Sequence, residues 1–150
     1  MSLGPETQIV LNIVIAALLG IILGLERTMA SKHAGMRTYG LVSMGSALFV
    51  TIGTMASFQF SLFTGINPLQ LAGFVIVGIG FIGSGLAAVG NNHPELTTAS
   101  GLWLAAGVGI AAGFGYYTLA FVSTILAILI FSLVLRIENS LRKRFKAEIE

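Results

Sequence analysis

Five long apolar runs dominate the sequence and restrict its fold more than any other feature. Each is long enough, or nearly so, to cross the roughly 30 Å hydrocarbon core of a bilayer. They predict transmembrane helices over residues 8–25, 39–57, 69–89, 97–113 and 116–136. Only 9% of the 150 residues are charged, against roughly 25% in an average soluble domain. We therefore expect one all-α, polytopic membrane domain over residues 1–150.

The boundary between the fourth and fifth runs is the least distinct. Gly113 and Gly115 suit a tight turn there, and Tyr116 and Tyr117 suit the membrane interface. The alternative is one long, tilted helix. A count of five is favoured because it agrees with the distribution of basic residues.

Lysine and arginine residues cluster after the first and after the last apolar run. The first cluster contains Arg27, Lys32 and Arg37, and the second runs from Arg136 into the tail at 137–150. Basic segments stay on the cytoplasmic side, and five spans place both clusters there, with the N-terminus outside. The tail repeats an apolar residue every four positions among charged ones. This indicates a short basic amphipathic helix on anionic lipid, or an ordinary solvated extension.

The same topology brings two polar segments to the cytoplasmic side. One segment follows the first run, and the other connects the third and fourth runs. They contain the candidate functional cluster, which is Glu26, Arg27, Arg37, Thr38, Asn92, Glu95, Thr97 and Thr98. Thr97 and Thr98 also suit the N-cap of the fourth helix.

Glu26 is the residue in this cluster that most needs a partner. A carboxylate within a bilayer costs roughly 2.5–3.5 kcal/mol on insertion scales. One alternative is a salt bridge with Arg37 that holds the first loop against the bundle. The other is a carboxylate that binds a proton or cation at the cytoplasmic mouth. Glu26 and Glu95 together would supply the hard oxygen ligands that Mg²⁺ prefers.

Small residues recur at four-residue spacing in several runs, which predicts helix faces that pack closely. The candidate packing residues are Gly20, Gly24, Gly80, Gly83, Gly85, Gly101, Ala105, Gly109 and Gly113. An alternative for residues 78–85 is an unwound helix that lines an ion path. Asn12, in the first run, requires an interhelical hydrogen bond.

Several classes of function do not fit the sequence. It contains no cysteine, no aspartate and no P-loop, so we expect no enzyme and no thiolate metal site. The basic residues lie beside apolar runs, where they set membrane orientation. They do not indicate nucleic-acid binding.

Two sets of segments form recognisable motifs. The first set is Gly24-Leu-Glu-Arg27, Ala34-Gly-Met-Arg-Thr38 and residues 41–49, and the second is residues 78–85, 96–103 and 105–113. They resemble the two signatures of the MgtC/SapB family of bacterial inner-membrane proteins. The resemblance covers about residues 10–135. It implies four or five helices in the bacterial inner membrane, and a link to magnesium limitation, acid tolerance and survival inside host cells.

The resemblance leaves more than one function open. A factor in Mg²⁺ or ion homeostasis would bind or pass a cation near Glu26. A non-transporting regulator would instead bind another membrane protein, such as an ATP synthase or transporter, through glycine-rich helix faces. A homo-oligomer, with a dimer favoured, is a third expectation. Long members of the family add a cytoplasmic domain that we do not expect here, and Glu95 stands where the family often has glycine.

Overall fold

The structure, a computed structural model, describes residues 4–60, 67–89, 96–134, 136–137 and 140. The described residues form α1 (Pro5–Met29), α2 (Met36–Gln59), α3 (Pro68–Val89), α4 (Leu96–Gly113), α5 (Tyr117–Leu129) and a π-helix, η1 (Ile130–Val134). Five spans are long and apolar enough to cross a membrane, the last of them combining α5 and η1. The predicted all-α bundle of five transmembrane helices is therefore confirmed. The predicted basic tail helix lies almost entirely outside the described residues.

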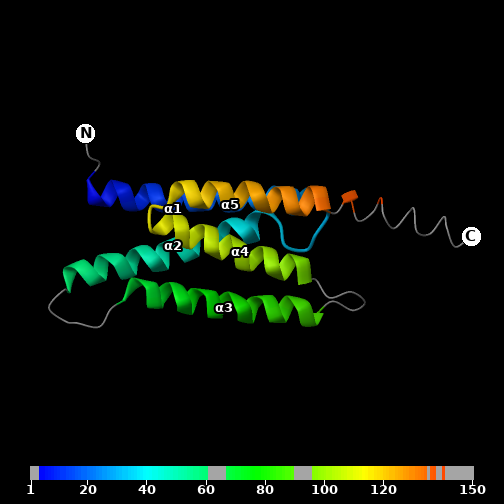
Figure 1. Cartoon of the computed structure of the whole chain (residues 1–150). Helices are drawn as coiled ribbons and strands as arrows, with labels where there is room; N and C mark the ends of the chain where they lie inside the picture. The colour runs from blue at the N-terminus through cyan, green and yellow to red at the C-terminus, as the bar shows by residue number, and fades with distance from the viewer. Residues whose placement is uncertain (1–3, 61–66, 90–95, 135, 138–139, 141–150) are drawn as a thin grey trace, which may run out of the picture.

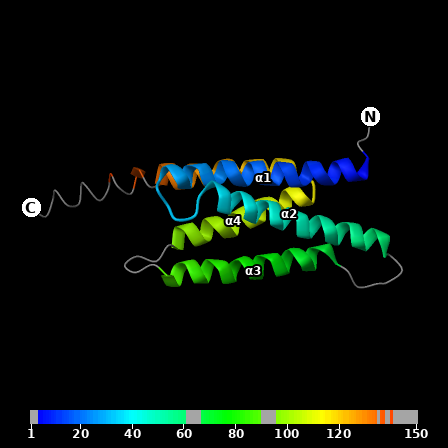
Figure 2. The same cartoon turned by 180° about the vertical axis from the view of Figure 1, so that it is seen from behind.

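Successive helices run in opposite directions (Figures 1 and 2). α1 and η1 therefore end where α2 and α4 begin, and we call this end of the bundle the polar end. The start of α1 lies at the opposite end. The segment that carries Glu26 and the start of α4 thus share one end, as the predicted topology requires.

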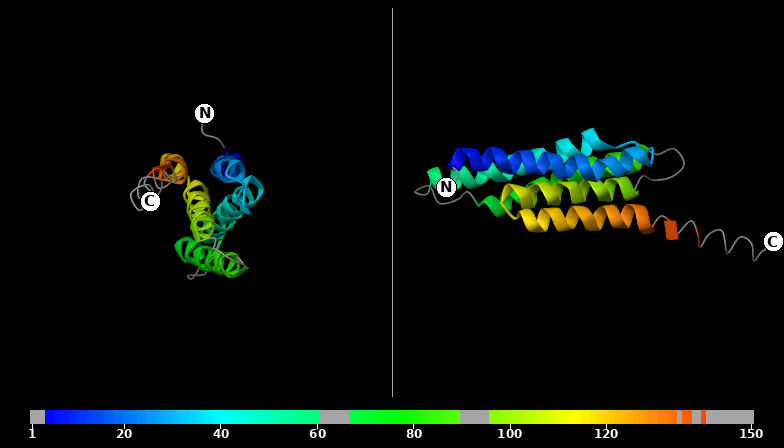
Figure 3. Two further views of the ribbon diagram at one scale, coloured as in Figure 1. Left: turned by 90° about the vertical axis from the view of Figure 1, so that its right-hand side faces the viewer. Right: turned by 90° about the horizontal axis from the view of Figure 1, so that it is seen from above.

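α4 is the central helix of the bundle. It contacts each of the other four helices, and the end-on view in Figure 3 shows it inside the arc that they form. Buried residues make up 56% of its span, against 11% for that of α3. The faces of α3 therefore remain largely open to the surroundings of the chain.

Small residues allow α1, α2 and α4 to approach one another closely at Ser43. A β-carbon built at Gly20 of α1 would lie 2.6 Å from Ser43 Cβ, and one at Gly109 of α4 would lie 2.8 Å from the Ser43 carbonyl carbon. Gly24, Gly101 and Gly113 lie at similarly close approaches, and Ala105 is buried. Such distances leave no room for a side chain, so these helices pack backbone against backbone.

The candidate packing residues of α3 have different surroundings. A β-carbon at Gly83 would make an ordinary 3.5 Å contact with Ala99. One at Gly80 or Gly85 would meet nothing within 4 Å in the described structure. Residues 78–85 are regular α-helix, so the alternative of an unwound helix is wrong.

The turn between α4 and α5 separates the two helices. Gly115 has a φ of +80°, which L side chains adopt only with strain. The amide of Tyr116 donates to the carbonyl of Ala111 at 2.8 Å, closing the turn. The alternative of one long helix is therefore wrong.

The ends of several helices differ from the predicted ones. α1 continues beyond Leu25 to Met29, and α2 begins at Met36. The Thr28 hydroxyl accepts a hydrogen bond from the Met36 amide at 3.1 Å and donates to the Gly24 carbonyl at 3.0 Å. These bonds tie the end of α1 to the start of α2, so the connecting loop is shorter than the sequence suggested.

Candidate functional site

Arg27 is the most deeply buried charged side chain among the described residues, with 2% of its surface exposed. Its Nε donates to Glu26 Oε2 at 2.8 Å. Its guanidinium carbon lies 4.2 Å from the centre of the Phe131 ring, a cation–π geometry. Its Nη1 atom is buried without a hydrogen-bond partner, although buried donors are normally satisfied. Among the described residues, the cation therefore has Glu26 as its ionic partner and leaves the N–H donors of Nη1 unused.

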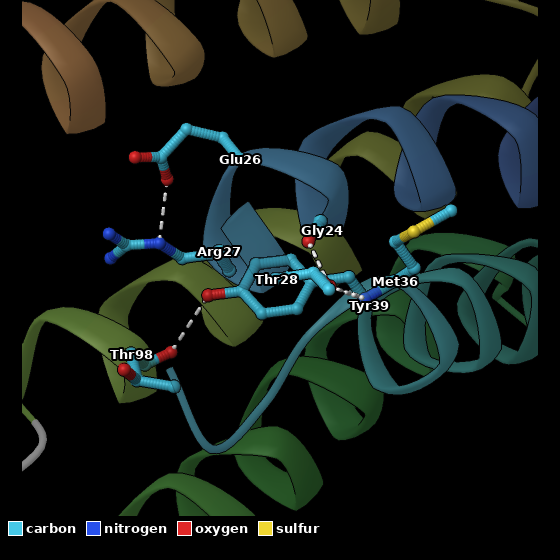
Figure 4. Close-up of polar contacts among 7 residues, drawn as sticks. All are labelled: Gly24, Glu26, Arg27, Thr28, Met36, Tyr39 and Thr98. Carbon is cyan, nitrogen blue, oxygen red and sulfur yellow. Dashed lines mark hydrogen bonds and ion pairs between the residues drawn. The ribbon is translucent and has the colours of Figure 1, made fainter. Parts of the chain in front are cut away.

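Glu26 extends from α1 on the side of the guanidinium away from Thr98 (Figure 4). Its side chain is 15% exposed, so the ion pair with Arg27 is largely removed from water. Glu26 also lines a groove of about 450 Å³ between the end of α1 and the segment formed by α5 and η1. The other residues that line the groove are Ile22, Leu25, Met29, Ala30, Ile128, Ser132 and Arg136.

Tyr39 connects the site to α4. Its ring is fully buried, and its hydroxyl donates to the backbone carbonyl of Thr98 at 3.3 Å (Figure 4). The ring occupies space beside Gly101, where a β-carbon would overlap the Tyr39 hydroxyl. Arg27, Tyr39 and Phe131 thus pack α1, α2 and η1 together at the polar end, and the hydrogen bond to Thr98 adds α4.

The predicted cluster is assembled only in part. Glu26 and Arg27 form an ion pair and Tyr39 bonds to Thr98, whereas Arg37 and Thr97 are exposed and Thr38 is half-buried on α2. Asn92 and Glu95 lie outside the described residues, and so does any metal site that they would form with Glu26. In the described part of the chain, no group of three histidine, cysteine or acidic side chains could hold a metal ion.

Two expectations about this cluster are wrong. Glu26 pairs with Arg27 and not with Arg37, because α1 continues past residue 25 and holds Arg27 inside the bundle. Thr97 and Thr98 do not occupy the N-cap, because α4 already begins at Leu96. They lie in its first turn.

Sequence reasoning missed Tyr39 and Phe131. Tyr39 follows Arg37 and Thr38 directly, but nothing in its context distinguishes it from an interfacial tyrosine. Phe131 lies on η1, and single-turn π-helices often occur at functional sites. The apolar run around Phe131 is typical of an ordinary α-helix, so the sequence does not indicate the change from α-helix to π-helix.

A second polar network lies at the opposite end of the bundle. Asn12 Nδ2 donates to the carbonyl of Gly113 at 2.9 Å, and Asn12 Oδ1 accepts from the Tyr117 hydroxyl. Gln8 Nε2 donates to Asn12 Oδ1 at 3.3 Å. The predicted interhelical hydrogen bond of Asn12 is therefore confirmed, and it joins α1 to the turn between α4 and α5.

Comparison with known proteins gives consistent matches. The sequence model of the MgtC family matches residues 13–140. The chain is 35% identical over 126 residues to YhiD of Escherichia coli K12, with 82% of this chain and 59% of YhiD covered. The name of YhiD describes it as a candidate magnesium transporter. The chain is 36% identical to protein SapB of Bacillus subtilis 168, with 79% and 53% covered. It is 37% identical to protein MgtC of Salmonella typhimurium LT2, with 78% and 48% covered.

The chain thus spans about half the length of the curated relatives that it matches. None of these three names describes an enzyme. No solved structure matches the chain.

Proposed function

The chain is a multi-pass bacterial membrane protein of the MgtC family, and from this premise we propose that it acts in Mg²⁺ homeostasis by binding or passing a cation at Glu26. The name of YhiD supports the choice of ion. The observation that carries the proposal is the Glu26 carboxylate. It lines a groove at the polar end, and only its Oε2 has a hydrogen-bond partner among the described residues. We place the protein in the inner membrane, with the polar end toward the cytoplasm.

A single carboxylate is a reasonable site for Mg²⁺. This ion keeps several of its waters and is commonly held by one or two carboxylates. Oε1 of Glu26 would bind it first, and we propose Glu95 as the second acidic ligand. The remaining positions would be filled by water in the groove.

Arg27 must respond when a cation binds at Glu26. The guanidinium lies 2.8 Å from Oε2 and neutralises the carboxylate, so an arriving cation competes with it. Arg27 also contacts the Phe131 ring, and that contact would hold the guanidinium after its ion pair weakens. Cation binding at Glu26 would therefore also affect Phe131 and the rest of η1.

A flux measurement tests the transport form of this proposal. Purified protein in liposomes should move Mg²⁺ down a gradient faster than empty vesicles do, and Glu26→Gln should abolish the excess. Glu6→Gln is the matched control, because Glu6 is exposed in the first turn of α1 at the opposite end. Flux that is equal in wild type and Glu26→Gln would refute passage at this carboxylate.

A second candidate is a non-transporting regulator, and the surface of α3 favours it. β-carbons at Gly73, Gly78, Gly80 and Gly85 would meet nothing within 4 Å in the described structure. Small residues exposed on a membrane helix allow another helix to approach closely. Gly73 and Gly80 are seven residues apart and share one face of α3, and this face suits either a different membrane protein or a second copy, with a homodimer as the simplest assembly. Absence of flux, together with a partner that co-purifies with wild type but not with Gly80→Leu, would favour this candidate.

A further inference from the structure

The groove at the polar end combines an apolar wall with one positive charge that no described residue pairs. Ile22, Leu25 and Met29 of α1 face Ile128 of α5 across it. Residues 22–29 cover about two helical turns, or about 10 Å along the helix axis. The groove volume, about 450 Å³, lies within the roughly 300–1,000 Å³ typical of ligand pockets.

The charged residues among the described lining of the groove are Glu26 and Arg136. Glu26 is neutralised by Arg27 at 2.8 Å. Arg136 lines the groove on the opposite wall and forms no ion pair with any described residue. The described groove therefore has a net charge close to +1. Ser132 lines it one turn before Arg136 and adds a hydroxyl group.

The position of the groove in the membrane matches a lipid. The last candidate span runs to Val134, and because arginine side chains near helix ends extend to the membrane interface, we expect Arg136 at the depth of lipid phosphates. Below it the apolar wall continues into the part of the bundle that faces acyl chains. A ligand with a singly charged phosphate joined to a hydrocarbon chain would match both Arg136 and the apolar wall of the groove.

We propose that this groove binds one anionic phospholipid. Its phosphate contacts the Arg136 guanidinium, which can form two parallel hydrogen bonds to phosphate oxygens. Its headgroup lies near Ser132 and Glu26, and one acyl chain packs against Ile22, Leu25 and Ile128. The site does not depend on ion binding at Glu26, and it would place a lipid beside the Glu26–Arg27 pair.

Native mass spectrometry of the whole chain tests this proposal. The protein is released from mixed micelles containing equal amounts of dioleoyl phosphatidylglycerol and dioleoyl phosphatidylcholine, with a chelator present so that no Mg²⁺ contributes. Wild type should retain one phosphatidylglycerol in preference to phosphatidylcholine. Arg136→Gln should weaken that binding about tenfold or more, because it removes a charge-assisted phosphate contact.

Two further variants separate a specific site from general attraction to anionic lipid. Arg37→Gln removes the same charge from an exposed position at the same end, and it should weaken binding by at most about fivefold, the effect expected of one arginine near an anionic surface. Ser132→Phe should reduce lipid retention by filling the groove without changing its charge. Equal retention of both lipids by wild type would overturn the proposal, and so would an Arg37→Gln effect as large as that of Arg136→Gln.

Discussion

Gly109→Ala should destabilise the bundle, although alanine forms helices better than glycine does. The new β-carbon would lie 2.8 Å from the Ser43 carbonyl carbon and 2.9 Å from its Cα. The β-carbon would also overlap the Ser43 carbonyl oxygen, and ordinary contact begins near 3.4 Å, so the backbone of α2 would have to move by clearly more than about 0.6 Å. It cannot move freely toward α1, because Ser43 Cβ is already close to Gly20. Overpacking of this kind costs about 1–3 kcal/mol, and the gain in helix propensity offsets up to about 1 kcal/mol.

Because the new β-carbon meets backbone atoms of Ser43, we expect a cost near the upper end of this range and a net loss of about 2 kcal/mol in the free energy of unfolding. Gly107→Ala is the matched control on the same helix, since a β-carbon there meets nothing within 4 Å. It should leave stability unchanged or raise it by up to about 1 kcal/mol. The assay is reversible unfolding in mixed micelles of increasing sodium dodecyl sulfate fraction, followed by far-ultraviolet circular dichroism. Equal stability of the two variants would refute the close approach of α2 and α4 at Ser43.

The same unfolding assay checks three further changes. Arg27→Gln should cost about 3 kcal/mol, because it leaves a largely buried carboxylate without its cation; the exposed Arg37→Gln should cost less than about 0.5 kcal/mol, and equal effects would contradict the ion pair. Asn12→Leu should cost about 0.6 kcal/mol and at most about 1.7 kcal/mol, the average and the maximum for hydrogen bonds between membrane helices, and an unchanged stability would rule out the bond to the end of α4. Gly115→Ala should cost about 1–2 kcal/mol because of its positive φ, and a neutral effect would contradict the left-handed conformation of this residue.

The spans and their order could be predicted because they depend on length and hydropathy alone. A membrane-spanning helix needs about 20 apolar residues, and each of the five runs is close to this length or exceeds it. The break before α5 was predictable because glycine favours the left-handed conformation that Gly115 adopts. The hydrogen bond of Asn12 followed from the cost of an unsatisfied amide in hydrocarbon.

The partners of Glu26 could not be predicted in the same way. The sequence shows two arginines close to this residue, and the choice between them depends on where α1 ends. α1 continues beyond the apolar run to Met29, and Thr28 joins this end to α2 through its bonds to Gly24 and Met36. Arg27 then turns inward to Phe131, a residue more than one hundred positions away. Contacts of this kind depend on helix rotation and on η1, and neither leaves a periodic signal in the sequence.

The central claim is that a cation binds at Glu26, and Mg²⁺ titration calorimetry of the purified protein tests it most directly. Wild type and Glu6→Gln should bind Mg²⁺ with the same affinity, whereas Glu26→Gln, which keeps the shape of the side chain but removes its charge, should bind at least about tenfold more weakly. Far-ultraviolet circular dichroism should show the same helix content in all three. An affinity unchanged in Glu26→Gln would contradict the claim.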